Sequence, residues 1–434
     1  MSKTRNPCIF LIAFSLLFCL APSATADVAP GDVIDTTNWQ KAEGLLPDSV
    51  LNWVKKGEFI LNIGELQWDP NDYWTDTCIR SMETNKGKYA LDEDGMVADA
   101  KTGETPTDFV EGIPFPEVNL EDPKSAFKIM HNRTFYGYTL GNIDYPFGAI
   151  WVSRGGYDRE VQAQFLQYPM AGFPGAKEEK NPKGIEQYSV VRVLSPYDIA
   201  GTNTMTWRYL DNRQDMTYAF VPAIRRVRRL SPANRSDAFI GTDMCLDDAY
   251  GYAGKISAVE WKPTKKKIAL VPFLSEKPQA LVQNERGEWL STSGIKPVVY
   301  GYQKKDWQGA PWAPTNLVWV KREILILEMK PKDPYYNYGT QYLWIDAAVP
   351  FITFYKIIQD RAADYWKTVL LCSNGFDGPN KEMRFVQGPM YIAVDDRYDH
   401  ATVLRALTPE TLGIWFAIQN PNIYSLGGFQ KLCK

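Results

Sequence analysis

The sequence predicts an α+β protein built on one large, curved antiparallel sheet. From residue 136 onward, segments of alternating apolar and polar residues follow one another with short turns between them instead of helices, which is typical of antiparallel pairing. The chain also holds 14 Trp, 24 Tyr and 20 Phe, and aromatic residues favour broad sheets and apolar pockets. A sheet with so many strands must curl or close on itself.

The first 26 residues have the pattern of a cleaved export signal. Lys3 and Arg5 give a positive start, residues 9–20 form an apolar run, and Ala24-Thr25-Ala26 fits a small-x-small cleavage site. The apolar run is shorter than the roughly 20 residues that span a bilayer as a helix, and no later stretch is long and uncharged enough to do so. We therefore expect a periplasmic, exported chain that is not membrane-spanning. Residues 27–434 would form a single large domain, beginning with a helical and loop-like segment at 27–135.

The charge balance and the cysteines narrow the class of protein. The chain carries 48 basic side chains, two of them in the export signal, against 51 acidic ones. Domains that bind nucleic acid are usually strongly basic, so no nucleic acid is expected as a partner. Four cysteines follow the signal, and their long spacings argue against zinc. Because exported proteins fold in an oxidising compartment, we expect two disulfides with all three pairings open. The cysteines are Cys78, Cys245, Cys372 and Cys433.

Helices are predicted mainly in the first third of the chain. A short helix would run within residues 36–45, and a second, over residues 48–57, would place Val50 and Val54 on its apolar side and end at Gly57. Residues 68–115 are rich in turn residues and indicate loops. A further helix would start at Pro123, because proline is favourable at the first helical position.

The clearest strand signal is a hairpin at residues 204–220. Apolar side chains alternate with polar ones on both sides of a turn at residues 211–213, so one face of the hairpin is apolar and the other is wetter. The apolar hairpin face consists of Met205, Trp207, Tyr209, Met216, Tyr218 and Phe220. Further strands are predicted in segments 188–195, 267–274, 296–302, 318–330, 341–358, 365–373 and 388–396.

Four arginines follow the hairpin directly. They are Arg225, Arg226, Arg228 and Arg229, and we call them the arginine cluster. The segment is predicted to form the next strand, with arginine on both sides of it. Asp243, Asp247 and Asp248 follow soon after, and Arg and carboxylate pair directionally. The cluster could be a structural ion-pair network, a docking surface for an acidic partner, or a contact for anionic lipid headgroups.

Several blocks of the sequence together resemble a known family. They include "LLPDSVLNWVKKGEF", "GIPFPEVNLEDPKSAFKIMHN", "YYNYGTQYLWIDAA" and "DYWKTVLL", and the most distinctive is "RRVRRLSPANRSDAFIGTDMCLDD". In this order they look like an exported bacterial domain-of-unknown-function family, number 1329, that is related to the LolA and LolB outer-membrane lipoprotein-sorting superfamily. The resemblance covers nearly the whole chain after the signal.

The resemblance implies a fold and a class of ligand. It implies an incomplete antiparallel barrel whose concave apolar face is covered by helices, and a lipid or other apolar small molecule carried in that concavity. The apolar hairpin face would line the cavity, and the helix around Val50 and Val54 would help to close it. The alternative for these residues is ordinary sheet core. The resemblance also implies an RND-type transporter or an outer-membrane protein as a partner, while the greater length of this chain leaves lipoprotein cargo open.

An enzymatic role has few candidate residues. The chain has only His131 and His400, far apart, for any histidine-based catalysis or metal binding. No G-x-S-x-G, Walker or dinucleotide-binding fingerprint appears in a suitable context. The acidic pairs at residues 247–248 and 395–396 could hold calcium or serve glycoside hydrolysis.

The sequence thus predicts a non-enzymatic carrier or binding protein for a lipid or apolar ligand, without a cofactor or metal. The second hypothesis is a scaffold of an envelope complex that docks through the arginine cluster. The third is a polysaccharide hydrolase.

Overall fold

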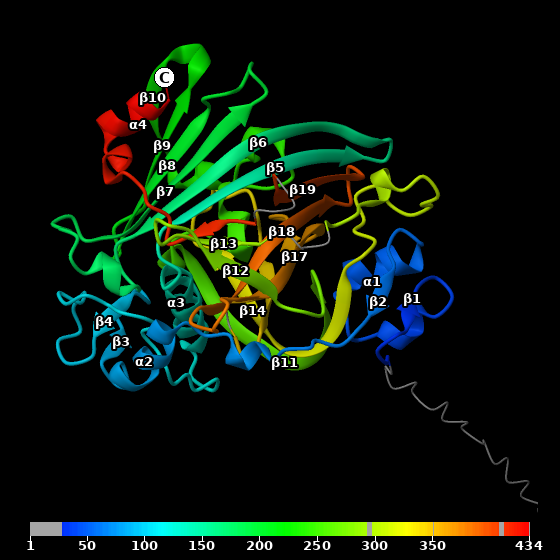
Figure 1. The fold of residues 1–434 in the computed structure, drawn as a ribbon, viewed down its shortest axis with the longest axis horizontal. Helices are drawn as coiled ribbons and strands as arrows, with labels where there is room; N and C mark the ends of the chain where they lie inside the picture. The colour runs from blue at the N-terminus through cyan, green and yellow to red at the C-terminus, as the bar shows by residue number, and fades with distance from the viewer. Residues whose placement is uncertain (1–27, 293–296, 350, 408–411, 434) are drawn as a thin grey trace, which may run out of the picture.

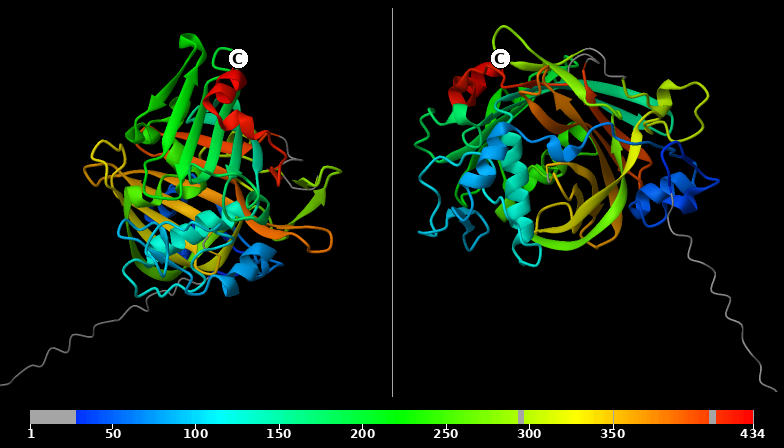
Figure 2. Two further views of the ribbon diagram at one scale, coloured as in Figure 1. Left: turned by 90° about the vertical axis from the view of Figure 1, so that its left-hand side faces the viewer. Right: turned by 60° about the horizontal axis from the view of Figure 1, so that its bottom comes forward.

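The computed structural model describes residues 28–292, 297–349, 351–407 and 412–433. The predicted export signal, residues 1–26, lies outside these ranges. One large sheet forms the centre of the described structure and curves into a ring-like shape (Figures 1 and 2). The prediction of an α+β protein with a large curved sheet is therefore confirmed.

The sheet consists mainly of antiparallel neighbours. Thirteen strands pair successively, each with the next. Their order is β10 (Arg226–Leu230), β9 (Met216–Val221), β8 (Asn203–Tyr209), β7 (Ile185–Ser195), β6 (Gly156–Pro169), β5 (Ile143–Ser153), β19 (His400–Ala406), β18 (Arg384–Asp395), β17 (Tyr365–Asp377), β16 (Thr353–Gln359), β15 (Gln341–Asp346), β14 (Val318–Pro331) and β11 (Val259–Phe273).

Short pairings bend this row of strands back on itself. The end of β11 meets β17 in parallel, at Phe273 and Ser373. On the same side of β17, β12 (Gln279–Gln283) also pairs in parallel and continues through β13 (Trp289–Ser291) and β20 (Ile414–Trp415) to β5. Each of β17 and β5 thus changes partner along its length. These exchanges bend the sheet into a ring-like shape, and the parallel pairs are an addition to the antiparallel pattern that the sequence predicts.

The strands and α-helices not yet described lie mostly before residue 140, together with the first 3-10 helix. They are β1 (Val33–Ile34), η1 (Trp39–Ala42), α1 (Asp48–Lys55), β2 (Leu61–Ile63), α2 (Asp76–Thr84), β3 (Tyr89–Leu91), β4 (Val97–Asp99) and α3 (Ser125–Tyr138), with α4 (Leu426–Leu432) near the C-terminus. The predicted helices at 48–57 and after Pro123 are present as α1 and α3. The predicted helix at 36–45 shrinks to one 3-10 turn, and α2 occupies part of the segment predicted as loop.

Helix α3 covers the concave face of the sheet. Eleven of its fourteen residues are buried, which is the pattern of a helix surrounded by protein on most sides. Ala126, Ile129 and Met130 pack against apolar side chains of β11, β14 and β15. Figure 2 shows α3, in cyan, standing across the opening of the curved sheet in its right-hand view. The expectation of a helix over the concave face is met by α3.

The C-terminal segment covers the outer face of the β7–β9 region. Tyr424 and Phe429, from η10 (Pro421–Tyr424) and α4, are buried in one cluster with apolar side chains of β7, β8 and β9. The indole of Trp207 donates a hydrogen bond to the Tyr424 carbonyl, 2.9 Å away. In Figures 1 and 2, α4 (red) lies beside the green strands of this region. Both faces of β8 are therefore buried.

The expectation of two disulfides requires correction. Cys78, Cys245, Cys372 and Cys433 are all buried and all free thiols. Cys245 and Cys433 belong to separate hydrophobic clusters. The sulfur of Cys78 contacts the hydroxyl of Thr139. Burial raises the pKa of the Cys78 thiol to about 11, so these cysteines act as small apolar side chains. None of the described helices is long and apolar enough to cross a membrane.

Candidate ligand cavity

A cavity of about 180 Å³ lies on the concave side of the sheet. Helix α3 forms one wall, strands β5 to β8 form a second, and residues 239–253 form a third. An engineered apolar protein cavity of about 150 Å³ suffices to bind benzene, so this volume admits a ring or part of an acyl chain. The apolar lining side chains include Ile143, Phe147, Ala149, Phe165, Val191, Phe239, Met244, Leu246, Tyr250, Phe351, Tyr391 and Leu404.

Local sequence explains how these elements present apolar groups to the cavity. Residues 147 and 149 are two positions apart on β5 and therefore share a face of the strand. Gly137 lets α3 approach the sheet side closely, because a Cβ at this position would come within 3.1 Å of the Phe351 ring. The same glycine lines the cavity. A larger side chain there would occupy the space between the helix and Phe351.

Three arginines line the cavity. No Asp, Glu, Lys or His of the described chain lines it. Arg208 pairs with Asp215 at 2.7 Å, and both side chains are buried. Arg235 pairs with Asp247 at 2.6 Å and also donates to the hydroxyls of Thr206 and Thr217. The third, Arg133 of α3, donates to the Tyr252 carbonyl and to the Thr353 hydroxyl.

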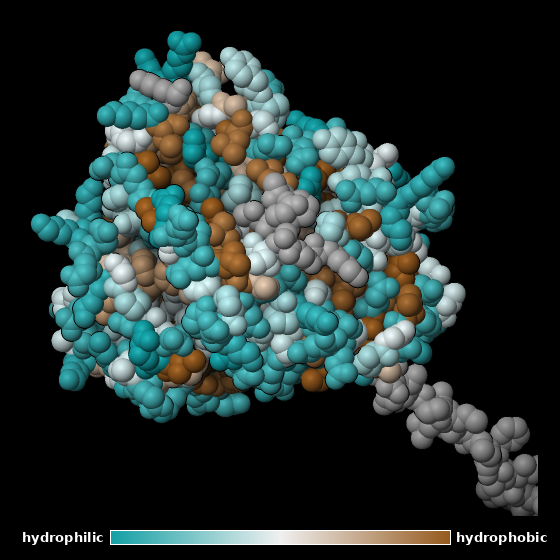
Figure 3. Space-filling model, in the orientation of Figure 1, coloured by the Kyte–Doolittle hydropathy of each residue, from teal (hydrophilic) through white to brown (hydrophobic). Residues whose placement is uncertain are grey.

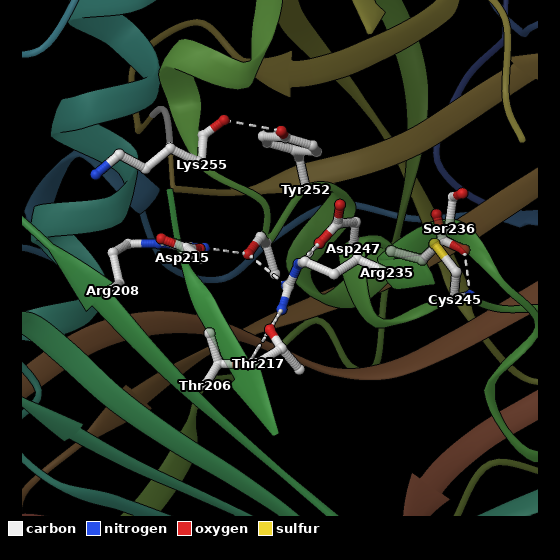
Figure 4. A network of polar contacts seen from close by, with 12 residues as sticks. Thr206, Arg208, Asp215, Thr217, Arg235, Ser236, Cys245, Asp247, Tyr252 and Lys255 are labelled. Carbon is white, nitrogen blue, oxygen red and sulfur yellow. Dashed lines mark hydrogen bonds and ion pairs between the residues drawn. The ribbon is translucent and has the colours of Figure 1, made fainter. Parts of the chain in front are cut away.

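The two paired arginines belong to one buried network (Figure 4). The carbonyl of Ala253 accepts hydrogen bonds from both Arg208 and Arg235 and so joins the two ion pairs. Burial alone would raise the pKa of Asp215, but the positive charges of Arg208 and Lys255, together with the hydrogen bonding of Arg208, outweigh it and hold that pKa below its usual value. The network is therefore charged and internally compensated at neutral pH.

A second, polar cleft of about 480 Å³ lies against the same network. Arg235 and Tyr252 line both the cleft and the apolar cavity, whereas Asp215, Asp247 and Lys255 line the cleft. The ion pairs thus form a wall between an apolar space and a polar one. This arrangement suits an amphiphile better than a purely apolar compound.

The apolar hairpin face lies on the other side of β8 and β9 from the cavity. Met205, Trp207, Tyr209 and Phe220 are buried in the cluster that also contains Tyr424 and Phe429, and Met216 and Tyr218 pack against it. The cavity is lined instead by the alternate residues of β8, Thr204, Thr206 and Arg208. The hairpin and its two faces form as predicted, but the C-terminal segment fills the apolar side.

Helix α1 also lies away from the cavity. Val50 and Val54 are fully buried in the main core of the ring. Neighbouring side chains anchor α1 to the far part of the sheet, since Ser49 hydrogen-bonds Thr368 of β17 and Trp53 hydrogen-bonds Asp396 after β18. Figures 1 and 2 place α1 on the opposite side of the molecule from β7–β10. Among the described α-helices it is α3 that borders the cavity.

The arginine cluster and the three aspartates are separated. Strand β10 forms as predicted, and Arg225, Arg226, Arg228 and Arg229 are all exposed, with no ion pair to any described residue. Asp247 pairs with Arg235, Asp248 with Lys356 at 2.6 Å, and Asp243 with His400 at 2.7 Å. Hydrophilic side chains cover the tip of the molecule that holds the β9–β10 hairpin (Figure 3).

The two histidines lie in different parts of the fold, and His400 is opposite Asp395 in the pairing of β19 with β18. His131 is 1% exposed and hydrogen-bonds the Gly95 carbonyl. His400, the first residue of β19, is half-buried, and its Nδ1 lies 2.7 Å from a carboxylate oxygen of Asp243. Asp395 and Asp396 accept hydrogen bonds from the indoles of Trp366 and Trp53. No group of three or more His, Cys, Asp or Glu residues is arranged to hold a metal ion within the described ranges.

Sequence reasoning missed Arg133, the third cavity-lining arginine. The signal was present in "KIMHNRTFYGY", where a basic residue stands in a helix with apolar residues on nearly every side. A charged side chain in a helix that is buried all round must have a partner or a function. That argument requires the burial of α3, which depends on residues of β11, β14 and β15 far along the chain.

The solved structures that match this chain include proteins of three bacteria. A domain proposed to belong to an outer membrane lipoprotein-sorting protein of Vibrio parahaemolyticus has a TM-score of 0.48 and 13% identity, covering 71% of this chain and 100% of that one. A DUF1329 family protein of Desulfovibrio piger has a TM-score of 0.43 and 12% identity over 70% of this chain and 98% of that one. A LolA superfamily protein of Nitrosomonas europaea has a TM-score of 0.40 and 11% identity, covering 70% of this chain and 98% of that one.

No curated protein is similar enough to match this chain. A family model does match it, and the matched region, residues 33–382, includes α3, the hairpin, the arginine cluster and the ion-pair network. Because this region is more than half of the sequence, the chain belongs to the family described as "protein of unknown function (DUF1329)".

Proposed function

We propose that this protein is an exported, non-enzymatic carrier that binds a lipid or other apolar ligand in the concave cavity. The observation that carries the proposal is the cavity of about 180 Å³ between α3 and the inner face of β5–β8, with its aromatic and aliphatic lining. Each methylene group removed from water contributes about 0.8 kcal/mol. An apolar ligand therefore gains from such a space when it must cross an aqueous compartment.

The cellular setting follows from the sequence. Residues 1–26 would direct export and be removed, and residues 27–434 would act in the periplasm as one domain. A soluble carrier needs a donor and an acceptor for its ligand. We propose an RND-type transporter or an outer-membrane protein for these roles, on the basis of the family resemblance.

Two measurements test the carrier proposal. Protein purified without detergent is extracted with organic solvent, and the extract is compared by mass spectrometry with that of an unrelated periplasmic protein treated identically. A stoichiometric apolar compound is expected. Binding of the neutral fluorescent probe N-phenylnaphthylamine is then measured by titration. A protein that yields no compound and binds no probe would refute the carrier proposal.

A cavity-filling variant locates the binding site. Ala149 lines the cavity and is 4% exposed, so Ala149→Phe places a ring in the space that the ligand would occupy. We expect the probe to bind at least about tenfold more weakly. Ala219→Phe is the matched control, because Ala219 of β9 pairs with Thr204 of β8 but does not line the cavity. Equal probe binding by both variants would place the ligand elsewhere.

A second candidate function is docking to an acidic protein partner through the arginine cluster. It is favoured by the exposure of all four arginines and by the absence of ion pairs to them from described residues. Polyglutamate serves as a probe of this surface. Replacing the four arginines with glutamine should abolish salt-sensitive binding of polyglutamate, whereas replacing Lys304 and Lys305, on another exposed loop, should not.

A further inference from the structure

We propose that the ligand is an apolar chain with a carboxylate head group, and that Arg133 binds that carboxylate inside the cavity. This inference rests on the proposed carrier function and specifies the chemical class of the ligand. It concerns one side chain on α3 that the fold leaves partly unsatisfied.

Arg133 is a buried cation with spare hydrogen-bonding capacity. Its exposed fraction is 3%, and it lines the cavity. Nη1 donates to the Tyr252 carbonyl at 3.1 Å, and Nε is 3.3 Å from the Thr353 hydroxyl. Nη2 is buried and has no hydrogen-bond partner within the described structure. Buried polar atoms are nearly always satisfied in folded proteins, so this donor lacks a partner that the complete complex would supply.

No carboxylate of the described residues forms an ion pair with Arg133. The other two cavity arginines provide an internal comparison, because Arg208 is paired with Asp215 and Arg235 with Asp247. The lining of the cavity includes no Asp or Glu from the described chain. An isolated buried charge is strongly unfavourable unless it is paired. The fold neutralises two of three buried guanidinium groups and leaves one for a ligand.

The groups around Arg133 cannot take over the role of a counter-ion at neutral pH. Burial lowers the pKa of Arg133, to about 10, so the guanidinium remains charged at pH 7. The ionisable groups that act on it are the phenols of Tyr391 and Tyr250. Burial raises the pKa of Tyr250 to about 12, and that of Tyr391 lies well above its usual range. Both phenols are therefore neutral, and the cavity retains one net positive charge at Arg133.

A carboxylate is the anion that this geometry fits. One guanidinium nitrogen is free and a second is held to a neutral carbonyl, which leaves room for a charge-assisted hydrogen bond from Arg to a planar, singly charged group. Phe351 and Tyr391, which line the same cavity, offer apolar surface for the chain attached to it. A head group at Arg133 would thus lie inside the cavity, with the chain along the aromatic wall.

The test compares two ligands that differ only in the head group. Decanoate and 1-decanol displace N-phenylnaphthylamine from wild-type protein, from Arg133→Met and from Arg133→Lys. Hydrogen bonds to charged groups are strong enough that wild type should prefer decanoate by about tenfold or more. Arg133→Met should lose this preference and bind 1-decanol undiminished, while Arg133→Lys should keep part of it. Arg226→Gln, on exposed β10, is the control for general electrostatic attraction and should behave as wild type.

The thermal midpoint distinguishes a binding role from a structural one. If Arg133 serves the ligand, Arg133→Met without ligand should melt at or above the wild-type temperature, because it removes an uncompensated buried charge. Decanoate should raise the midpoint of wild type but not of the variant. Equal affinity of wild type for decanoate and 1-decanol would overturn the inference while leaving the carrier proposal intact. Failure to bind either compound or the probe would refute the carrier proposal itself. Should Arg133→Met not fold, Arg133→Gln replaces it, and the wild-type comparison still decides.

Discussion

Arg235 and Asp247 form a buried ion pair in the wall between the apolar cavity and the polar cleft. Nη2 of Arg235 lies 2.6 Å from Oδ1 of Asp247, and the two side chains are 9% and 4% exposed. Asp247 also accepts a hydrogen bond from the hydroxyl of Tyr336. Arg235 and Asp247 are 12 positions apart in the chain, and Tyr336 lies 89 positions after Asp247. The wall therefore depends on the tertiary fold.

Removing one member of this pair should destabilise the protein strongly. Asp247→Ala leaves the guanidinium of Arg235 buried and uncompensated, which typically costs about 3–5 kcal/mol. Urea unfolding followed by tryptophan fluorescence measures the loss. The double variant Arg235→Met/Asp247→Leu removes both charges and should recover most of it. A single variant as stable as wild type would show that water reaches the pair.

Acid should destabilise the protein through His131. Burial lowers the pKa of His131 to about 4, compared with about 6.5 in an unfolded chain. Between these pH values the unfolded state binds a proton that the folded state does not, so the free energy of unfolding falls as the pH falls. The expected loss is about 3 kcal/mol. His131→Gln keeps a donor for the Gly95 carbonyl but removes the titration. Its unfolding free energy should depend less on pH between 7 and 4.5 than that of wild type, and parallel curves would contradict the prediction.

The pKa of His400 should be shifted in the opposite direction to that of His131. Its hydrogen bond to Asp243, together with the charge of that carboxylate, raises the pKa of His400 above the usual value. A raised pKa adds stability that is fully present below about pH 6.5 and is lost as the pH rises through the folded-state pKa. The chain has two histidines, so NMR titration of the imidazole protons resolves both. Asp243→Asn should lower the pKa of His400 and leave His131 unchanged.

The C-terminal segment should contribute to stability but not to ligand selection. Phe429 is fully buried against the outer face of β7–β9, and Phe429→Ala should cost about 3–5 kcal/mol by creating a cavity. Leu426→Ala on the same helix is the control, because Leu426 is 44% exposed and surface changes usually stay within about 0.5 kcal/mol. Calorimetry measures both variants. If Phe429→Ala altered the preference for decanoate over 1-decanol, the outer face would have to communicate with the cavity.

The sequence predicted local features well where alternation or capping set them. The β8–β9 hairpin forms with Met205 opposite Tyr218 and Trp207 opposite Met216, as expected from the period of two. Helix α2 was missed because its sequence is polar and lies among turn residues; the hydroxyl of Thr75, which accepts from the amide of Cys78, caps it. Residues 297–302, part of a segment predicted as a strand, instead hold one isolated bridge, between Tyr300 and Pro314, and the start of the 3-10 helix Gly301–Gln303.

The candidate site was less predictable because it depends on contacts between distant segments. Alternation on β8 indicates two faces, but it does not tell which face meets a cavity when both are buried. The carbonyl of Tyr424 accepts a hydrogen bond from Trp207, 217 positions earlier in the chain. No local sequence pattern predicts that contact. The same limit applies to Arg133, whose neighbours Tyr252 and Thr353 are 119 and 220 positions away.

Strand β10 lies at the end of the row of paired strands, with β9 as its one partner among the described strands. The outer edge of such a strand offers unpaired backbone donors and acceptors to any other extended chain, which is a route to self-association and aggregation. The arginine cluster gives every copy of the protein the same positive charge along this edge. Two copies that approach edge to edge therefore repel each other. The charge of the arginine cluster thus disfavours pairing between the β10 edges of two molecules.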